Sequence, residues 1–289
     1  MKKLLFHLDT DPMPSAFDTV VAYDGGADHV TGYSALTPAN VGPIVEGAIF
    51  TRSPKEKQYT ALFIGGSDLA AGQELLEAVK KKFFANFRVS VMLDSNGSNT
   101  TAAAGVVQLA QRGTLKGRRA VVLAGTGPVG QRAAAILALE GADVTLTSRK
   151  MERAQRACQL MKERFNVNLK PAQANDDASF SQAIEGAQVI YATGAAGVQL
   201  LKEQHWKDHP TLETIADANA TPPLGIEGID MMDKGTERHG KVVIGGIGVG
   251  GLKLKLHRAC IGRLFEHHDQ VFDSEEIYNF ATEIADPDW

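Results

Sequence analysis

Short apolar runs alternate with longer stretches of helical period along the whole chain. In the first third, the apolar runs are residues 3–8, 61–64 and 89–93, and the helical stretches are 15–23, 68–84 and 98–111. Runs of four to eight apolar residues indicate buried strands, whereas apolar positions three or four apart indicate helices. Strands that alternate with helices predict a mostly parallel sheet covered by helices.

A second alternating set begins after the short polar segment 113–119. Its predicted strands are residues 120–123, 144–147, 189–192, 214–216 and 242–244, with a helix at 152–165. This set is long enough for a complete doubly wound Rossmann domain. The helical stretches 252–267 and 274–285 follow the last strand, so at least one of them is expected to return to the first domain.

These patterns predict an α/β protein of two domains, which its length of 289 residues also favours. We place the boundary in or near the helix at 99–111. The N-terminal α/β domain then comprises residues 1–112, completed by a C-terminal helix at 270–289, and the Rossmann domain comprises residues 113–269.

Composition narrows the possible functions. Hydrophobic residues make up 44% of the chain and charged residues 22%, which is typical of a globular protein. The formal net charge of −4 disfavours nucleic acid and anionic membranes as partners. The two cysteines, Cys158 and Cys260, have no metal-ligand spacing, so we expect no metal site. We expect a reduced, cytoplasmic setting for the protein. No apolar run is long enough to span a bilayer.

The most specific motif is a glycine-rich segment between a buried-type strand and an alanine-rich helix. The G-x-G-x-x-G spacing of a dinucleotide-binding loop is formed by Gly125, Thr126, Gly127, Pro128, Val129 and Gly130. In such loops the first glycine allows a tight turn, the second lets the backbone approach a pyrophosphate, and the third lets the helix pack closely. The strand and helix on either side make this interpretation stronger than the glycines alone would.

The end of the next strand indicates which dinucleotide binds. An acidic residue there would accept hydrogen bonds from a ribose 2′-hydroxyl, but the sequence has Ser148, Arg149 and Lys150. A guanidinium can form paired hydrogen bonds to a phosphate, and the lysine adds charge. We therefore expect NADP as the cofactor. The alternative is that these residues only end the strand.

Further cofactor contacts are expected where later strands end on the ligand side of the sheet. The residues at these strand ends that we assign to cofactor binding are Thr193, Gly194, Ala195, Asn219, Gly246 and Gly248. For the glycine-rich run 245–251, a plain turn after the strand is the alternative interpretation.

Four segments together resemble one enzyme family. The cofactor motif GTGPVG, the segment DSNGSNTTAAAG at 94–105, NATPPLGIEGID at 219–230 and GVGGLKLKLHRAC at 248–260 resemble the NADP-dependent methylene-tetrahydromethanopterin dehydrogenases of methylotrophic bacteria. The resemblance extends to the N-terminal FHLDTDPMPSAFD. It implies one-carbon metabolism, a homo-oligomer, and oxidation of methylene-tetrahydromethanopterin, with methylene-tetrahydrofolate as a possible second substrate. It also implies a pterin site in a cleft between the two domains.

That chemistry requires no nucleophile or base. The methylene carbon between two nitrogens surrenders a hydride and leaves a cation that both nitrogens stabilise, so the enzyme mainly positions donor and acceptor. Lys253 follows the last Rossmann strand, and we assign it to pterin contact and catalysis; Lys255 cannot share its helix face. A solvated helix-start lysine is the alternative, and His257 is expected simply to pack.

Short polar side chains cluster where the strand at 89–93 leads into a helix. Capping a helix needs only one or two of them, so we assign Asn99, Thr100 and Thr101 to substrate binding. A carboxylate matches the donor edge of a pterin. Asp18 is the preferred carboxylate and Asp9 the alternative, although both also suit ordinary structural positions.

Two other functions remain open from the residues alone. A shikimate-type or amino-acid-type dehydrogenase shares the two-domain plan, but its reaction moves a proton with the hydride and needs a clear acid–base residue. A regulatory module that binds NADP without catalysis would show no turnover with any reduced pterin.

Overall fold

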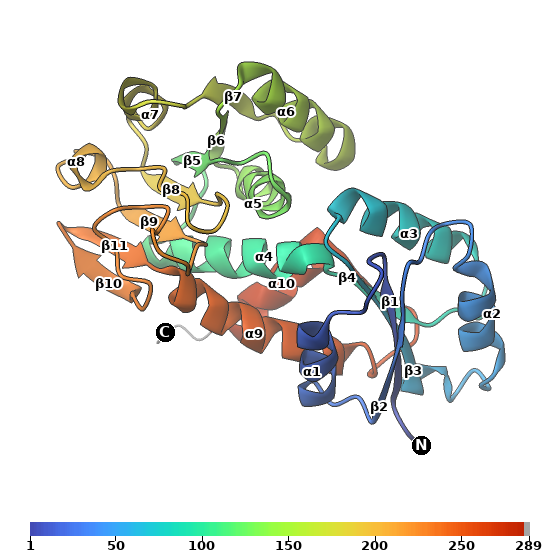
Figure 1. The fold of residues 1–289 in the computed structure, drawn as a ribbon. Helices are drawn as coiled ribbons and strands as arrows, with labels where there is room; N and C mark the ends of the chain where they lie inside the picture. The colour runs from blue at the N-terminus through green and yellow to red at the C-terminus, as the bar shows by residue number, and fades with distance from the viewer. Residues whose placement is uncertain (286–289) are drawn as a thin grey trace. The chain divides into compact units, whose positions relative to one another are not determined.

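The computed structural model describes residues 1–285, and within them the chain divides into two compact units. Unit 1 comprises Met1–Thr100 and Leu254–Phe280, and unit 2 comprises Thr101–Lys253 together with the described residues from Ala281 onward. The α/β fold class with mostly parallel sheets is confirmed. Figure 1 labels the helices and strands of both units.

Unit 1 is a parallel sheet with helices on both faces. Its elements are β1 (Leu4–Asp9), α1 (Ala16–Asp24), β2 (His29–Tyr33), α2 (Gly42–Phe50), β3 (Thr60–Gly65), α3 (Leu69–Lys81), β4 (Ser90–Leu93), β12 (Val271–Phe272) and α10 (Ser274–Ile284). The strand order is β12-β4-β3-β1-β2, and all pairs are parallel. The order reverses between β1 and β3, where doubly wound sheets bind ligands at the carboxyl ends of the strands.

The two faces of this sheet differ in chemistry. Leu8, Leu62 and Ile64 belong to an apolar core that also includes residues of α2 and α3. Side chains alternate along a strand, so His7 and Asp9 lie on the opposite face, where they pair in register with Phe63 and Gly65 of β3. The ionisable side chains His7 and Asp9 are therefore buried on the face opposite this apolar core.

Unit 2 is a Rossmann sheet. Its elements are β5 (Arg119–Leu123), α5 (Pro128–Leu139), β6 (Asp143–Ser148), α6 (Met151–Phe165), β7 (Lys170–Gln173), α7 (Asp177–Ala183), β8 (Val189–Ala192), α8 (Glu203–Trp206), β9 (Thr214–Asp217), β10 (Lys234–Arg238) and β11 (Lys241–Ile244). The order is β10-β11-β9-β8-β5-β6-β7, and only β10 runs antiparallel among the described strands. The order reverses between β5 and β8, which is the switch point of this sheet.

Within residues 1–285, three helices belong partly to each unit. α4 (Ser98–Leu109) passes from unit 1 to unit 2 after Thr100, α9 (Gly246–Arg263) passes back after Lys253, and α10 passes to unit 2 after Phe280. The units therefore change inside helices, whereas the expected boundaries were 112/113 and 269/270. Short 3-10 turns occur at Lys57–Tyr59, Ser95–Gly97 and Ala110–Arg112.

The C-terminal segment was expected to complete the N-terminal domain as a helix at 270–289. In the structure it adds the strand β12 to β4 before α10 begins, and unit 1 includes it through Phe280. Residues 286–289 of that expected helix lie outside the described residues.

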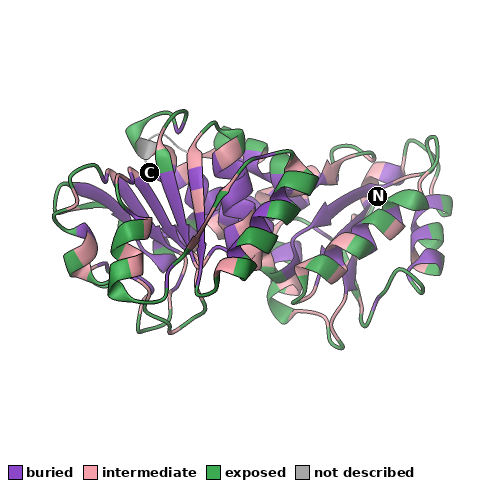
Figure 2. Ribbon diagram, turned by 90° about the horizontal axis from the view of Figure 1, so that it is seen from above, coloured by how far each residue is buried: buried purple, intermediate pink, exposed green. Residues whose placement is uncertain are grey.

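Burial follows the central strands of both sheets. Figure 2 shows these strands as mainly buried, with exposed residues on the outer sides of the helices. Among the helices of residues 1–285, none has both the length and the apolar character needed to cross a lipid bilayer.

Candidate functional site

The three glycines of the predicted dinucleotide loop occupy three different environments. A Cβ on Gly125 would lie 2.7 Å from Leu146 Cγ, and one on Gly130 would lie 2.5 Å from Gly125 Cα. A Cβ on Gly127, in contrast, would meet no protein atom within 4 Å. The first and third glycines are therefore required by the tight turn and by close helix packing, whereas the second borders open space.

The open space lies at the start of α5. Gly127 is the N-cap of this helix and makes no side-chain capping hydrogen bond, and Pro128 stands at its first turn. Uncapped amides and the positive end of the helix dipole favour an anion at this position. Thr126, Gly127 and Val129 are partly exposed beside it. These residues fit the pyrophosphate of a dinucleotide.

The next strand over contributes a second loop at the same switch point. β8 pairs with β5, and Thr193 follows β8 directly. Its hydroxyl donates a hydrogen bond of 3.0 Å to the Leu123 carbonyl, and it lies 2.6 Å from where a Gly130 Cβ would be. Gly194 and Ala195 come next and are half-buried and exposed, respectively. The structure thus brings the glycine loop and the 193–195 loop together.

The predicted 2′-phosphate residues lie at the carboxyl end of β6, beside β5. Ser148 is buried, while Arg149 and Lys150 are exposed. Within residues 1–285, neither side chain forms a hydrogen bond or ion pair with protein, so both are available to a ligand. Their assignment to the phosphate stays a prediction.

We expect Arg149→Ala to weaken NADP binding at least about tenfold while leaving NAD binding nearly unchanged. Charge-assisted hydrogen bonds to the 2′-phosphate contribute ~1.5–3 kcal/mol each, and NAD has no such phosphate. Titration of each oxidised cofactor by calorimetry measures both affinities. Arg156→Ala, which changes another exposed arginine farther along α6, is the control. Equal losses for NADP and NAD would contradict the assignment.

The glycine-rich run after β11 is the start of a helix, and not the plain turn of the alternative interpretation. α9 begins at Gly246. A Cβ on Gly246 would lie 2.6 Å from the Asn219 backbone, and one on Gly248 would lie 2.2 Å from the Asp233 carbonyl oxygen. These glycines are therefore explained by close packing of α9 on two loops. Their role in cofactor binding stays a prediction.

Asn219 has internal partners as well. Its side chain accepts a hydrogen bond from Thr221 N at 2.7 Å and donates one to the Pro223 carbonyl at 3.1 Å. Its backbone N–H donates to Asp217 Oδ1 at 2.9 Å. Asn219 thus shapes the loop after β9, and a cofactor contact by its side chain stays a prediction.

Asp217 is a buried carboxylate at the end of β9. Burial raises its pKa to about 6, although backbone N–H groups of Asn219, Ile226 and Gly225 act in the opposite direction. In the unfolded chain the pKa is near its ordinary value, so the folded state binds this proton more tightly. The stability that Asp217 contributes is therefore complete at low pH and is lost as the pH rises through about 6.

We expect this contribution to be absent in Asp217→Asn. The free energy of unfolding of the natural protein should fall, relative to that of the variant, by about 2 kcal/mol between roughly pH 4 and pH 7.5, because the pKa differs by about two units between the two states and part of that difference already acts at pH 4. Urea unfolding of both proteins across this range measures the difference. If the difference in unfolding free energy between the two proteins did not change with pH, the expectation would be contradicted. Altered hydrogen bonding in the variant adds the same amount at every pH and therefore does not affect the test.

In unit 1, the predicted substrate residues Asn99 and Thr100 surround a buried carboxylate that the sequence analysis did not assign. Asp94 Oδ1 accepts hydrogen bonds from the N–H groups of Asn99 at 2.9 Å and Thr100 at 3.0 Å, and Oδ2 accepts one from Thr100 Oγ1 at 2.6 Å. Asn99 also donates to the Leu93 carbonyl. Both predicted residues are fully buried.

These contacts give Asn99 and Thr100 a role inside the protein, and direct contact with substrate stays a prediction. Thr101 belongs to unit 2, where its carbonyl accepts a hydrogen bond from the Tyr191 hydroxyl at 3.1 Å. Asp94 could have been found in the sequence as an acidic residue directly after a buried strand and before the cluster of polar residues.

The two candidate pterin carboxylates differ in burial. Asp9 is buried, and its oxygens accept hydrogen bonds from the backbone of Asp11 at 2.8 Å and Ser15 at 3.0 Å. Asp18 lies in the first turn of α1 and is half-buried. The structure therefore explains Asp9 as the anchor of the loop after β1, and a pterin contact by Asp18 stays a prediction.

His7 lies beside both carboxylates on the buried polar face of unit 1. Its Nε2 is 3.2 Å from Asp9 Oδ2. Burial lowers the pKa of His7, and the opposing effects of Asp18 and Asp9 are smaller. A neutral imidazole at neutral pH follows. The sequence makes room for it at Gly65, where a Cβ would lie 2.6 Å from His7 Nε2.

The lysines of α9 differ in exposure as the sequence analysis required. Lys253 is half-buried and Lys255 is exposed. His257 follows Lys253 by one helical turn on the same side of α9 and is fully buried, so its side chain packs inside unit 1 as expected. Its imidazole stacks on Phe63, with ring centroids 5.3 Å apart.

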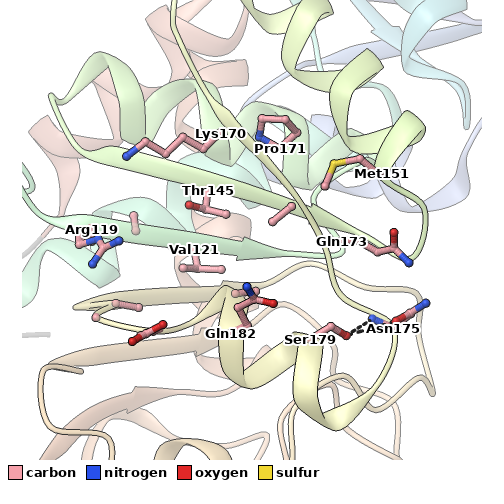
Figure 3. A pocket seen from close by; sticks show the side chains of 16 residues that line it. Arg119, Val121, Thr145, Met151, Lys170, Pro171, Gln173, Asn175, Ser179 and Gln182 are labelled. Carbon is pink, nitrogen blue, oxygen red and sulfur yellow. Dashed lines mark hydrogen bonds between the residues drawn. The ribbon is translucent and has the colours of Figure 1, made fainter.

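A groove of about 970 Å³ lies on unit 2, over β5, β6 and β7 and beside α7. Figure 3 shows Thr145 and Val121 along the strands, with Gln173, Gln182 and Asn175 around them. α7 has seven residues, none of them buried, so it covers this side of the sheet incompletely. The groove is lined by none of the predicted cofactor residues and is not assigned to the cofactor.

Comparisons with known proteins found relatives of this chain and solved structures of similar fold. A family model described as the N-terminal part of methylene-tetrahydromethanopterin dehydrogenase matches residues 16–96. Bifunctional protein MdtA of Methylorubrum extorquens is 59% identical over 286 residues, which covers 98% of this chain and 99% of that protein. Among solved structures, a shikimate 5-dehydrogenase from Mycobacterium fortuitum has a TM-score of 0.54 at 15% identity, covering 97% of this chain and 98% of that one.

A second relative is named for its enzymatic activity. NAD(P)-dependent methylenetetrahydromethanopterin dehydrogenase of Methylorubrum extorquens is 32% identical over 281 residues, which covers 94% of this chain and 95% of that protein. The likeness to the shikimate dehydrogenase concerns the fold alone, whereas the likeness to the two Methylorubrum proteins extends through the sequence. The chain therefore belongs to the methylene-tetrahydromethanopterin dehydrogenase family.

Proposed function

We propose that this protein oxidises methylene-tetrahydromethanopterin to the methenyl pterin with NADP⁺, and that methylene-tetrahydrofolate is a second substrate. The observation that carries the proposal is the 32% identity, over nearly the whole chain, to the NAD(P)-dependent methylenetetrahydromethanopterin dehydrogenase. The dinucleotide loop with open space at Gly127 supports it independently.

Different residues of unit 2 would bind different parts of the cofactor. Gly127 and the start of α5 would hold the pyrophosphate, Arg149 and Lys150 the 2′-phosphate, and the 193–195 loop the nicotinamide half. When bound, NADP⁺ supplies the acceptor for the hydride. The chain itself has to hold the pterin in place, since loss of hydride from a carbon between two nitrogens needs no base.

We assign the binding of the pterin to residues of unit 1 and α9. Asp18 would read the donor edge of the pterin, because a carboxylate accepts hydrogen bonds from an amino group and a ring N–H. Lys253 would contact a pterin oxygen or nitrogen. The shikimate-type alternative is less well supported, because that likeness rests on 15% identity and shows only the fold.

One assay tests the proposal. The purified protein is incubated with methylene-tetrahydromethanopterin or methylene-tetrahydrofolate and with NADP⁺ or NAD⁺, and the absorbance of the reduced nicotinamide is followed. We expect turnover with NADP⁺ and at least the first pterin. Cofactor binding without turnover of either pterin would favour the regulatory module, and turnover of a hydroxy acid would favour the other dehydrogenases.

Two further expectations belong to this proposal. The family resemblance supports a homo-oligomer, which light scattering of the purified protein would measure. A reduced, cytoplasmic setting is supported by two free, buried cysteines, Cys158 and Cys260.

A further inference from the structure

The carboxylate of Asp94 lies where two helices of unit 1 meet. It follows β4 at the carboxyl end of the sheet, and its side chain is fully buried. It accepts three hydrogen bonds from the first turn of α4, through Asn99 N, Thr100 N and Thr100 Oγ1. On the side of α9, its Oδ2 lies 3.8 Å from His257 Nδ1, and the His257 side chain is also fully buried.

Helix capping alone does not explain a buried carboxylate. Serine, threonine and asparagine cap helices about as well as aspartate does, and none of them brings a charge into the interior. An ionised group loses its hydration when it is buried, so it is kept where a charged or strongly polar partner compensates for that loss. His257 faces Asp94 from α9 and can supply this compensation.

The imidazole of His257 is held from two directions. Phe63 stacks on its ring with an interplanar angle of 29°, and this contact restricts the plane of the ring. Asp94 Oδ2 lies 3.8 Å from Nδ1, which is within ion-pair distance and longer than a hydrogen bond, so the carboxylate acts on the ring through its charge. Lys253 precedes His257 by one turn on α9. The pair therefore lies one helical turn after Lys253 on α9.

We propose that Asp94 is a positioning residue for the pterin reaction: its carboxylate orients His257 and, through it, the turn of α9 next to Lys253, while it also holds the start of α4. This inference rests on the proposed function. In this proposal Asp94 contacts neither substrate nor cofactor. Its negative charge is needed for turnover in addition to the hydrogen bonds with which it caps α4.

Asp94→Asn tests the charge, because asparagine keeps an acceptor for the α4 amides; it removes the charge that faces His257 and the Oδ2 acceptor of the Thr100 hydroxyl, and Thr100→Val, which removes that hydroxyl alone, measures the second effect. We expect kcat with methylene-tetrahydromethanopterin to fall at least about tenfold, with the NADP dissociation constant and the melting temperature close to those of the natural protein. Ser90→Ala is the matched control. It removes a buried hydrogen bond to the His267 carbonyl at the other end of β4 and should leave kcat unchanged.

His257→Gln and the double variant decide between positioning and a local structural effect. If Asp94 acts through His257, the double variant has the same activity as the less active of the two single variants. The second substitution then has no further effect, because the interaction it would remove is already absent. Independent, multiplying losses would overturn the proposal, as would full activity of Asp94→Asn. Should Asp94→Asn not fold, His257→Gln with full activity would overturn it and a tenfold loss would support it.

The same assay separates this proposal from the proposed function. Turnover of the pterin by the natural protein establishes the function first, and the ratios among the variants then judge Asp94. If the natural protein turns over neither pterin, the proposed function fails and the role of Asp94 in that reaction fails with it.

Discussion

Gly127→Val should remove most NADP binding and leave the fold intact. A Cβ at this position would meet no protein atom within 4 Å, so the valine begins in space that the structure leaves open at the start of α5. This is the space where a pyrophosphate would approach the backbone. We expect the NADP dissociation constant to rise at least about a hundredfold, which corresponds to ~3 kcal/mol of binding free energy.

The stability cost of the same substitution should be small. Valine is a poorer N-cap than glycine, and the difference is ~1 kcal/mol, so the melting temperature should fall by only a few degrees. Calorimetric titration with NADP and thermal unfolding of the unliganded protein measure the two effects separately.

Gly130→Ala is the control that fits this structure. Its Cβ would lie 2.5 Å from Gly125 Cα, and a backbone neighbour cannot move aside cheaply. We expect it to destabilise the protein by ~1–3 kcal/mol and to lose binding as a consequence. An unchanged NADP affinity in folded Gly127→Val would refute the assignment of the loop to the cofactor.

Lys253→Ala should lower turnover with methylene-tetrahydromethanopterin at least about tenfold, a loss of ~1.4 kcal/mol of transition-state stabilisation. Lys253 is half-buried near the start of α9, after the last parallel strand of unit 2, and the reaction depends on how the pterin is placed. NADP affinity should stay near that of the natural protein, because the residues assigned to the phosphates lie after β5 and β6.

The sign of the charge limits what Lys253 can contact. The methenyl product is a cation, so an ammonium facing the reacting carbon would oppose the transition state. We therefore expect contact with a pterin oxygen or nitrogen away from that carbon. The rate loss should appear without a bell-shaped pH profile, because the hydride step transfers no proton.

Lys255→Ala is the matched control, since Lys255 is exposed on the same helix. Full activity of Lys253→Ala together with a loss in Lys255→Ala would show that the other lysine contacts the pterin. Full activity of both would make this segment structural.

The cofactor loop could be predicted from the sequence in detail because its requirements are local. Gly125 and Gly130 are needed where one short loop turns and a helix packs on it, and both constraints act within a few residues. Gly246 and Gly248 show the limit of this reasoning. They resembled a ligand loop, but their small size is required by the backbones of Asn219 and Asp233, which are close only in the folded protein.

The substrate side of the site was less predictable for the same reason. The polar cluster around Asn99 and Thr100 was visible as a pattern, but its hydrogen-bond acceptor, Asp94, also lies within ion-pair distance of His257, which comes from a distant part of the chain. Their separation in sequence hides a contact of 3.8 Å. A pattern of residue types therefore located the cluster without giving the role of each member.

The strands show most clearly what the sequence determined by itself. Every predicted strand lies in the interior of a sheet: β1, β3 and β4 in unit 1, and β5, β6, β8, β9 and β11 in unit 2. Interior strands of parallel sheets are buried on both faces, so their sequences are mainly apolar. Such a run indicates a strand without any information about the neighbouring strands. This was enough to predict the α/β class and the two sheets, with the glycine-rich loop between β5 and α5.

The tertiary structure decided the edges of both sheets and the course of the chain between the units. The strands that were not predicted, β2, β7, β10 and β12, are the outermost strands of the two sheets. β2 and β10 are largely exposed, and β12 has two residues, so their sequences carry no apolar run. An edge strand is stabilised by backbone hydrogen bonds to a neighbour that is already in place, and these bonds do not depend on side-chain type.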